Sequence, residues 1–166
     1  MKAVETLESK IYTDASELRK KIQGLQKAQK TVVFTNGCFD ILHRGHVEYL
    51  CRARDLGDCL VLGLNSDESV RGLKGPDRPI QPLEDRLRIM AGLFCLDFIV
   101  PFAEQTPEHL LSVLQPDIHT KGGDYKQETL PEARVVESYG GRVVLLPFLE
   151  GRSSSSIIKK SKSTGD

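Results

Sequence analysis

Two histidines, His43 and His46, stand where an apolar segment gives way to a helical pattern. Residues 31–34 are β-branched or aromatic, which is typical of a buried parallel strand, and apolar residues recur at helical spacing after His46. The free N–H groups and the dipole of a first helical turn favour an anion, and Gly45 adds no Cβ that would keep a phosphate away. Two imidazoles at such a junction can donate hydrogen bonds to phosphoryl oxygens. These residues therefore predict a phosphate-handling site.

A single histidine near a helix start is more often a cap or a surface residue, but this pair belongs to a longer motif. Residues 36–46 resemble the first signature of the nucleotidyltransferase superfamily with a His-x-Gly-His motif, which includes cytidylyltransferases and adenylyltransferases. The resemblance assigns His43 and His46 to phosphates. Nucleotide contacts are expected from these residues of the run: Asn36, Gly37, Cys38, Phe39 and Gly45.

The rest of the chain alternates between strand-like and helical patterns, which predicts a single α/β domain with a parallel sheet. Strands are expected at about residues 31–35, 59–64, 97–101, 117–121 and 142–146. Glycines and polar residues follow the first, fourth and fifth strands, at the edge where an open parallel sheet binds its ligands. We expect a five-stranded Rossmann-like sheet flanked by helices, and the superfamily resemblance implies the strand order 3-2-1-4-5.

Several sequence features mark where helices are expected to begin and end. Asp14 begins a capping-box spacing, and apolar residues from Leu83 to Phe94 keep helical register. Thr106 is the expected N-cap of a helix with proline at its first position, and another helix is expected to begin at Pro131. We expect a helical extension over residues 1–30, a nucleotidyltransferase domain over residues 31–160 and a frayed tail over residues 161–166.

Composition excludes several other classes of protein. The chain has 166 residues, with 23 basic and 23 acidic side chains. A formal net charge of zero offers no broad basic field for nucleic acid or an anionic membrane. Its apolar runs are far shorter than the ~20 residues of a membrane helix, and the N-terminus is too charged for a signal peptide. A cytoplasmic protein with four reduced cysteines is expected, and no NAD-binding GxGxxG motif is present.

Two further segments are candidates for the phosphate site. Ser153, Ser154 and Ser155 precede a last helical segment. They can simply cap that helix, but a Ser/Thr cluster at this place binds nucleotide phosphates in the resembling superfamily. Lys74 stands in a polar, proline-rich loop, residues 73–79, which is either an ordinary solvated loop or a cover for the crevice. A lysine from this loop closes over phosphates in similar enzymes.

The segment after the fourth strand is a candidate for contacts with the nucleotide or the sugar. Gly122 and Gly123 allow a close approach of the backbone to a base or a ribose. Asp124 and Tyr125 follow them and can supply polar contacts.

Each of the remaining polar residues can also be explained by a purely structural role. Arg86 is a candidate for substrate binding, although a salt bridge with an acidic residue of its own helix explains it nearly as well. Asp40 is a candidate ligand of substrate or metal, or it orders its loop. His109, in the first turn of a helix, and His119, inside a strand, are interpreted as structural residues without a chemical partner.

Taken together, the motifs make the resemblance closer than superfamily level. Over about residues 31–160 the chain is similar to the D-glycero-β-D-manno-heptose 1-phosphate adenylyltransferase family, in its separate form without a sugar-kinase domain. The matching segments are residues 35–46, 64–71, 73–75, 78–80, 105–107 and 121–125. The resemblance implies transfer of AMP from ATP to a heptose 1-phosphate, giving ADP-heptose and pyrophosphate for lipopolysaccharide or surface-glycan biosynthesis. It also implies Mg²⁺ carried mainly by ATP and water, with no protein side chain assigned as its ligand, and a homodimer.

Two rival functions share some of these residues. A cytidylyltransferase acting on glycerol 3-phosphate or a similar small phosphorylated alcohol has the same first motif, but such enzymes usually carry arginines where this chain has Phe94 and Phe148. A nucleotide-binding module without turnover is the other rival. The intact histidine pair and lysine loop argue against it.

Overall fold

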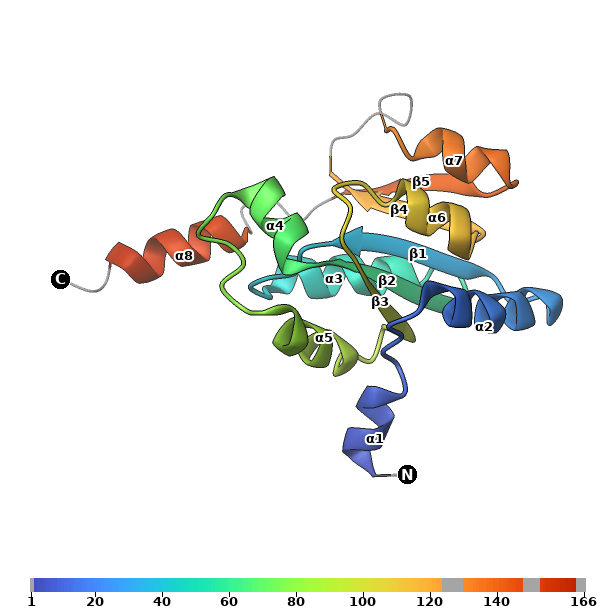
Figure 1. Ribbon diagram of the computed structural model, residues 1–166, viewed down its shortest axis with the longest axis horizontal. Coiled ribbons are helices and arrows are strands. Elements are labelled where there is room, and N and C mark those ends of the chain that lie inside the picture. The colour runs from blue at the N-terminus through green and yellow to red at the C-terminus, as the bar shows by residue number, and fades with distance from the viewer. Residues whose placement is uncertain (1, 124–129, 148–152, 164–166) are drawn as a thin grey trace.

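The computed structural model describes residues 2–123, 130–147 and 153–163. At its centre lies a five-stranded parallel sheet in the order β3-β2-β1-β4-β5 (Figure 1). The strands are β1 (Val32–Gly37), β2 (Cys59–Asn65), β3 (Phe98–Phe102), β4 (Ile118–Gly122) and β5 (Arg142–Leu146). This architecture confirms the predicted fold class and strand order.

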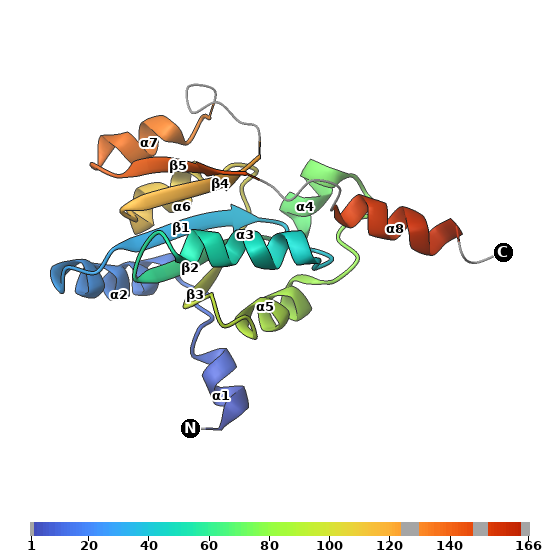
Figure 2. The same ribbon diagram turned by 180° about the vertical axis from the view of Figure 1, so that it is seen from behind.

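Helices cover both faces of the sheet (Figure 1 and Figure 2). They are α1 (Ala3–Glu8), α2 (Ala15–Lys27), α3 (Arg44–Arg54), α4 (Asp67–Lys74), α5 (Leu83–Ala91), α6 (Glu108–Leu114), α7 (Ala133–Ser138) and α8 (Ser154–Ser163). One face packs against α2, α6 and α7, and the other packs against α3 and α5. Helix α4 lies near the carboxyl ends of the strands, and α8 projects away from the sheet beside it.

The two apolar layers explain why β1 is apolar without alternation. Val32 and Phe34 contribute to the cluster on the α2 side, whereas Val33 contributes to the cluster on the α3 side. All three side chains are fully buried. A strand whose two faces are both covered needs apolar residues at successive positions, and this requirement places β1 in the centre of the sheet.

The connections place the ligand-binding edge at β1. From β1 the chain proceeds outward through β2 to β3, then returns to β4 on the opposite side of β1. Parallel connections that leave a strand in opposite directions open a crevice at its carboxyl end. Asn36 at the end of β1 and Lys121 at the end of β4 therefore reach the same edge of the sheet.

Several helix boundaries differ from the expectation. The helix expected to continue to Phe94 ends at Ala91, and the Phe94 side chain is 84% exposed. Helix α6 begins one residue after Pro107, and Thr106 donates to the Glu108 carboxylate instead of capping. Lys74 is the last residue of α4, so the loop begins only at Gly75, whose φ of 100° ends the helix. Within the described part of the chain, no helix is long and apolar enough to span a membrane.

Candidate active site

A cavity of about 560 Å³ opens at the carboxyl edge of the sheet. Its lining comes from the ends of β1, β2 and β4, the first turn of α3, the end of α4, and the start of α8. The lining residues are Asn36, Gly37, Cys38, Phe39, Asp40, His43, Gly45, His46, Tyr49, Asn65, Leu73, Lys74, Arg78, Gln105, Lys121, Gly122, Ser153, Ser154 and Ser155. Segments more than 100 residues apart in sequence thus meet around one cavity, as the positions of the glycines and serines predicted.

The two histidines form a stacked pair in this cavity. His43 is the N-cap of α3, and its carbonyl accepts a hydrogen bond from the backbone N–H of His46 at 2.9 Å. Their rings stack with centroids 3.7 Å apart and an interplanar angle of 21°. Burial, together with the charge of His43, lowers the pKa of His46 to about 4. His46 is therefore an uncharged imidazole at neutral pH, and an uncharged imidazole can donate one hydrogen bond.

Phe39 and Gly37 hold the pair from the strand side. The Phe39 ring lies 5.0 Å from the His46 ring, centroid to centroid, and Phe39 has a φ of 43°. A Cβ added at Gly37 would lie 2.7 Å from Cε2 of Phe39, which is closer than atoms of these types approach. Glycine at this position therefore permits the Phe39 ring to pack beside His46.

Asp40 is buried and fully engaged by the protein. Its carboxylate accepts hydrogen bonds from the backbone N–H groups of Ile80 and Gln81, at 2.8 Å each, and from Nε of Arg78 at 2.6 Å. Burial alone would raise the pKa of Asp40, but these hydrogen bonds outweigh it and lower that pKa. Of the two sequence interpretations, these contacts match loop ordering: Asp40 fastens the loop after α4 to the end of β1.

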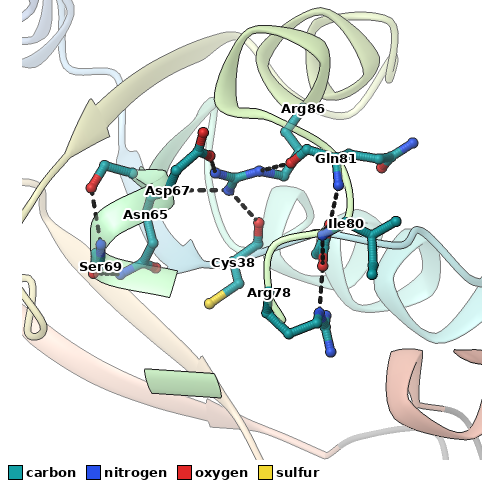
Figure 3. A network of polar contacts seen from close by, with 10 residues as sticks. Cys38, Asn65, Asp67, Ser69, Arg78, Ile80, Gln81 and Arg86 are labelled. Atoms are coloured by element: carbon teal, nitrogen blue, oxygen red, sulfur yellow. Dashed lines mark hydrogen bonds and ion pairs between the residues drawn. The ribbon is translucent and has the colours of Figure 1, made fainter. Parts of the chain in front are cut away.

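Arg86 forms a second buried anchor on the same loop. Its guanidinium is 0% exposed and donates to the carbonyl oxygens of Cys38, Asn65 and Gln81 and to the Asp67 carboxylate, at 2.7 to 3.0 Å (Figure 3). Arg86 is not among the residues that line the cavity. Its partner acid also comes from α4, not from its own helix as the alternative interpretation supposed. The arginine expected at the substrate thus lies behind the cavity wall and ties β1, β2 and α5 together.

Lys121 brings a further cation to the cavity, next to β1. Its Nζ donates to Glu132 at 2.9 Å and lies 3.5 Å from Oδ1 of Asn36. His119 Nε2 lies 3.4 Å from the same Glu132 oxygen. Burial alone would raise the pKa of Glu132, but the hydrogen bonds from His119 and Lys121 outweigh it and lower the pKa to about 2. His119, expected to have no chemical partner, therefore belongs to a charged cluster.

The outer rim of the cavity carries Lys74 and the serine cluster. Lys74 is exposed and lines the cavity from the end of α4. Ser154 Oγ donates to the carbonyl of Ile41 at 2.9 Å, which attaches the start of α8 to the segment before His43. Ser153 Oγ accepts the backbone N–H of Ser156 at 3.2 Å, so this hydroxyl also acts as a cap, as the alternative interpretation allowed.

The segment after β4 is only partly described. Gly122 lines the cavity, whereas Gly123, with a φ of 119°, is not among the lining residues. Asp124 and Tyr125 lie outside the described residues.

Six lining residues carried no predicted role: Tyr49, Asn65, Leu73, Arg78, Gln105 and Lys121. Arg78 had a detectable signal, because it is a cation in the loop that was expected to cover the crevice. Tyr49 had none, because its position in α3 fits an ordinary apolar stripe. Its hydroxyl is 2.7 Å from Thr35 Oγ1, and this contact depends on the fold.

Several known proteins are similar to this chain in sequence or in fold. The profile of the cytidylyltransferase-like family matches residues 34–160. The bifunctional protein HldE of Syntrophotalea carbinolica is 54% identical over 143 residues, which is 86% of this chain and 29% of that protein. The HldE of Geobacter sulfurreducens is 56% identical over 136 residues, 81% of this chain and 28% of the relative. The chain thus spans less than a third of the length of these curated relatives.

A solved structure shows the same fold. The crystal structure of the lipopolysaccharide core biosynthesis protein from Thermoplasma volcanium matches with a TM-score of 0.62 and 27% sequence identity, covering 74% of this chain and 99% of that one. The family profile alone spans well over half of the chain and includes most of β1, the histidine pair and the start of α8. The chain therefore belongs to the cytidylyltransferase-like family.

Proposed function

We propose that this chain is an adenylyltransferase that transfers AMP from ATP to a heptose 1-phosphate, producing ADP-heptose and pyrophosphate for lipopolysaccharide or surface-glycan biosynthesis. The observation that carries the proposal is the stacked pair His43 and His46, which lines one cavity together with Lys74 and the serines of α8. Imidazole, ammonium and hydroxyl groups around one cavity are donors suited to a polyphosphate chain.

The reaction requires positioning more than covalent chemistry. An oxygen of the sugar phosphate attacks the α-phosphorus of ATP, a new P–O bond forms, and the bond to the bridging oxygen breaks as pyrophosphate leaves with the electron pair. The barrier comes from bringing two anions together and from charge that shifts toward the leaving group. His43 and His46 donate to phosphoryl oxygens, and Lys74 closes over them from the rim. No protein nucleophile is needed.

Mg²⁺ would enter with the triphosphate in this proposal. Asp40 is the one carboxylate among the described lining residues, and it already accepts three protein donors. The described residues contain no group of three or more His, Cys, Asp or Glu side chains that could hold a metal ion. A cation bound mainly by phosphate oxygens and water fits such a lining, since Mg²⁺ usually keeps several waters. It would neutralise charge on the leaving pyrophosphate.

We also propose roles for the remaining residues of the site. Gly45, Gly122 and the backbone of residues 36–39 lie where a nucleotide can approach closely, and Ser153, Ser154 and Ser155 can donate to its phosphates. A nucleotide contact of Gly123, and contacts of Asp124 and Tyr125 with nucleotide or sugar, are predictions from the sequence alone. For Arg86 and Asp40 we propose positioning roles in place of substrate contact.

The assignment of the sugar phosphate substrate rests on the similar proteins, not on the cavity itself. The similar proteins are named HldE or described as acting in lipopolysaccharide core biosynthesis, which supports a heptose phosphate. The family description favours a cytidylyl donor and keeps the glycerol 3-phosphate cytidylyltransferase as the second candidate.

Pyrophosphate release distinguishes the two candidates. Purified protein would be assayed with ATP or CTP against β-heptose 1-phosphate and glycerol 3-phosphate. We expect turnover with ATP and the heptose phosphate only. Turnover with CTP alone would overturn the proposal, and no release with any pair would favour a binding module. The same preparation tests a proposed homodimer, because light scattering separates the 18.5 kDa chain from twice that mass.

A further inference from the structure

A buried cluster of three titratable side chains borders the cavity and has no part in the mechanism above. It consists of His119 and Lys121 from β4 and Glu132 from the segment before α7. The His119 side chain is 0% exposed and that of Glu132 is 3% exposed, whereas that of Lys121 is 21% exposed and lines the cavity. The cluster thus runs from the interior to the ligand space, with its cation at the open end.

Among the residues that the structure describes, two acceptors approach the ammonium group of Lys121, so one of its donors remains for a ligand in the cavity. An ammonium group has three N–H donors. One reaches Oε1 of Glu132 at 2.9 Å, and a second direction is occupied by Oδ1 of Asn36 at 3.5 Å. Asn36 belongs to the lining at the end of β1, in the same run as His43 and His46. Lys121 Nζ is therefore held against the strand from which the histidine pair follows.

The cost of burying Glu132 indicates that the cluster does more than fill space. A carboxylate that is almost fully buried is destabilising unless it is well paired, and apolar residues often replace such pairs without loss of stability. Here the two cluster partners, His119 and Lys121, both approach the same oxygen. Holding the Lys121 side chain in one place also costs rotamer entropy.

We propose that Lys121 is a phosphate-binding residue of the cavity and that Glu132, supported by His119, is the positioning residue that aims its ammonium group. The inference rests on the proposed nucleotidyl transfer and adds a contact to it. The shared chemistry is a phosphoryl oxygen, which either ATP or the sugar 1-phosphate can supply. Glu132 acts through Lys121 and touches neither.

The test is a double-mutant cycle on Lys121→Met and Glu132→Gln. Removing a charge-assisted contact to a phosphate should lower kcat/KM by at least about tenfold in Lys121→Met. Glu132→Gln should produce a smaller loss in the wild-type background and less than about a twofold further loss in Lys121→Met, because its effect passes through the lysine. Lys121→Arg should recover part of the activity. The substrate whose KM rises identifies the source of the phosphoryl oxygen.

The control is Lys30→Met, which removes a lysine from the Lys30–Asp58 pair outside the cavity lining. It should change kcat/KM by less than about twofold. Additive losses in the cycle, or unchanged kinetic constants in Lys121→Met, would overturn the inference even if the wild-type enzyme turns over. Calorimetric titration with ATP and with heptose 1-phosphate, separately, keeps the test independent of turnover. If wild-type protein releases no pyrophosphate, the proposed function fails, whereas equal affinities of wild type and Lys121→Met for both ligands refute the lysine contact.

Discussion

Replacement of Asp40 by alanine should destabilise the whole domain, because this carboxylate joins two segments of the cavity wall. It is 1% exposed and accepts three donors, the backbone N–H groups of Ile80 and Gln81 and Nε of Arg78. Alanine leaves two backbone N–H groups and one guanidinium without their acceptor. Asparagine keeps one acceptor oxygen but loses the charge.

The magnitude follows from these three contacts. A hydrogen bond to a charged group contributes about 1.5–3 kcal/mol, but such values do not add fully, and water from the adjoining cavity can satisfy part of the vacated donors. We expect Asp40→Ala to lower the free energy of unfolding by about 3 kcal/mol and Asp40→Asn by about half of that. For a chain of this length, 3 kcal/mol corresponds to a fall in Tm of about 6–12 °C.

Thermal and urea unfolding would measure the change, with Asp58→Ala as a matched control. Asp58 also accepts a backbone N–H, from Thr31 at 2.8 Å, and a side-chain cation, but its side chain is 43% exposed. Its loss should destabilise the protein clearly less than the loss of Asp40, because solvent screens an exposed ion pair. Equal destabilisation by Asp40→Ala and Asp58→Ala would show that burial and multiple donors at Asp40 do not set the effect, and the reasoning would be wrong.

The pH dependence gives an independent check on Asp40. Its folded-state pKa lies below the ordinary value of 3.8. The carboxylate therefore stabilises the fold fully above the unfolded-state pKa, and this contribution is lost as pH falls through the folded-state pKa. Wild-type protein should lose more stability than Asp40→Ala when the pH is lowered below about 4.

Three further predictions concern the histidine pair and Arg86. His46→Ala should lower kcat at least about a hundredfold, since one lost transition-state donor costs ~3–4 kcal/mol, while circular dichroism stays unchanged; a loss under tenfold contradicts its role. The pKa of His46 falls from 6.5 to about 4 on folding, so the unfolded chain binds a proton at a higher pH than the folded protein does. The free energy of unfolding should therefore fall as the pH drops from 6.5 toward 4. Urea unfolding at pH 7 and pH 5 should show a smaller fall for His46→Gln than for the wild-type protein. Arg86→Lys cannot reach all four acceptors and should lower the free energy of unfolding by about 2–4 kcal/mol in the same assay, and an unchanged value would refute the anchoring role.

Local sequence pattern was sufficient for most of the sheet. The apolar runs placed every strand within about two residues, because a buried parallel strand must be apolar at successive positions. Helix ends were less predictable. Helix α4 has only eight residues, several of them charged, so the residues preceding Gly75 resembled a loop. A helix this short depends on packing against the rest of the fold, and that packing leaves no local pattern.

Site residues that belong to a contiguous motif could be predicted from the sequence, whereas residues whose roles depend on long-range contacts could not. His43, His46 and the serines were found because their chemistry is concentrated in short runs. Arg86 resembled a substrate-binding residue because its acceptors include backbone carbonyls of Cys38 and Asn65, which sequence does not mark. Glu132 was interpreted only as part of a helix start, because no local pattern marks its contact with Lys121, eleven residues earlier in the chain.

Two cations of the cavity, Arg78 and Lys121, each lie against a buried carboxylate of their own, Asp40 and Glu132. Each pair is close to electrically neutral, so the electrostatic attraction of a small inorganic anion to this part of the cavity is weak. A ligand must instead offer several acceptor oxygens at the spacing of the fixed donors. These two pairs would then help the cavity to discriminate against the phosphate, chloride and sulfate that surround any enzyme, and their contribution to ligand binding should depend only weakly on ionic strength.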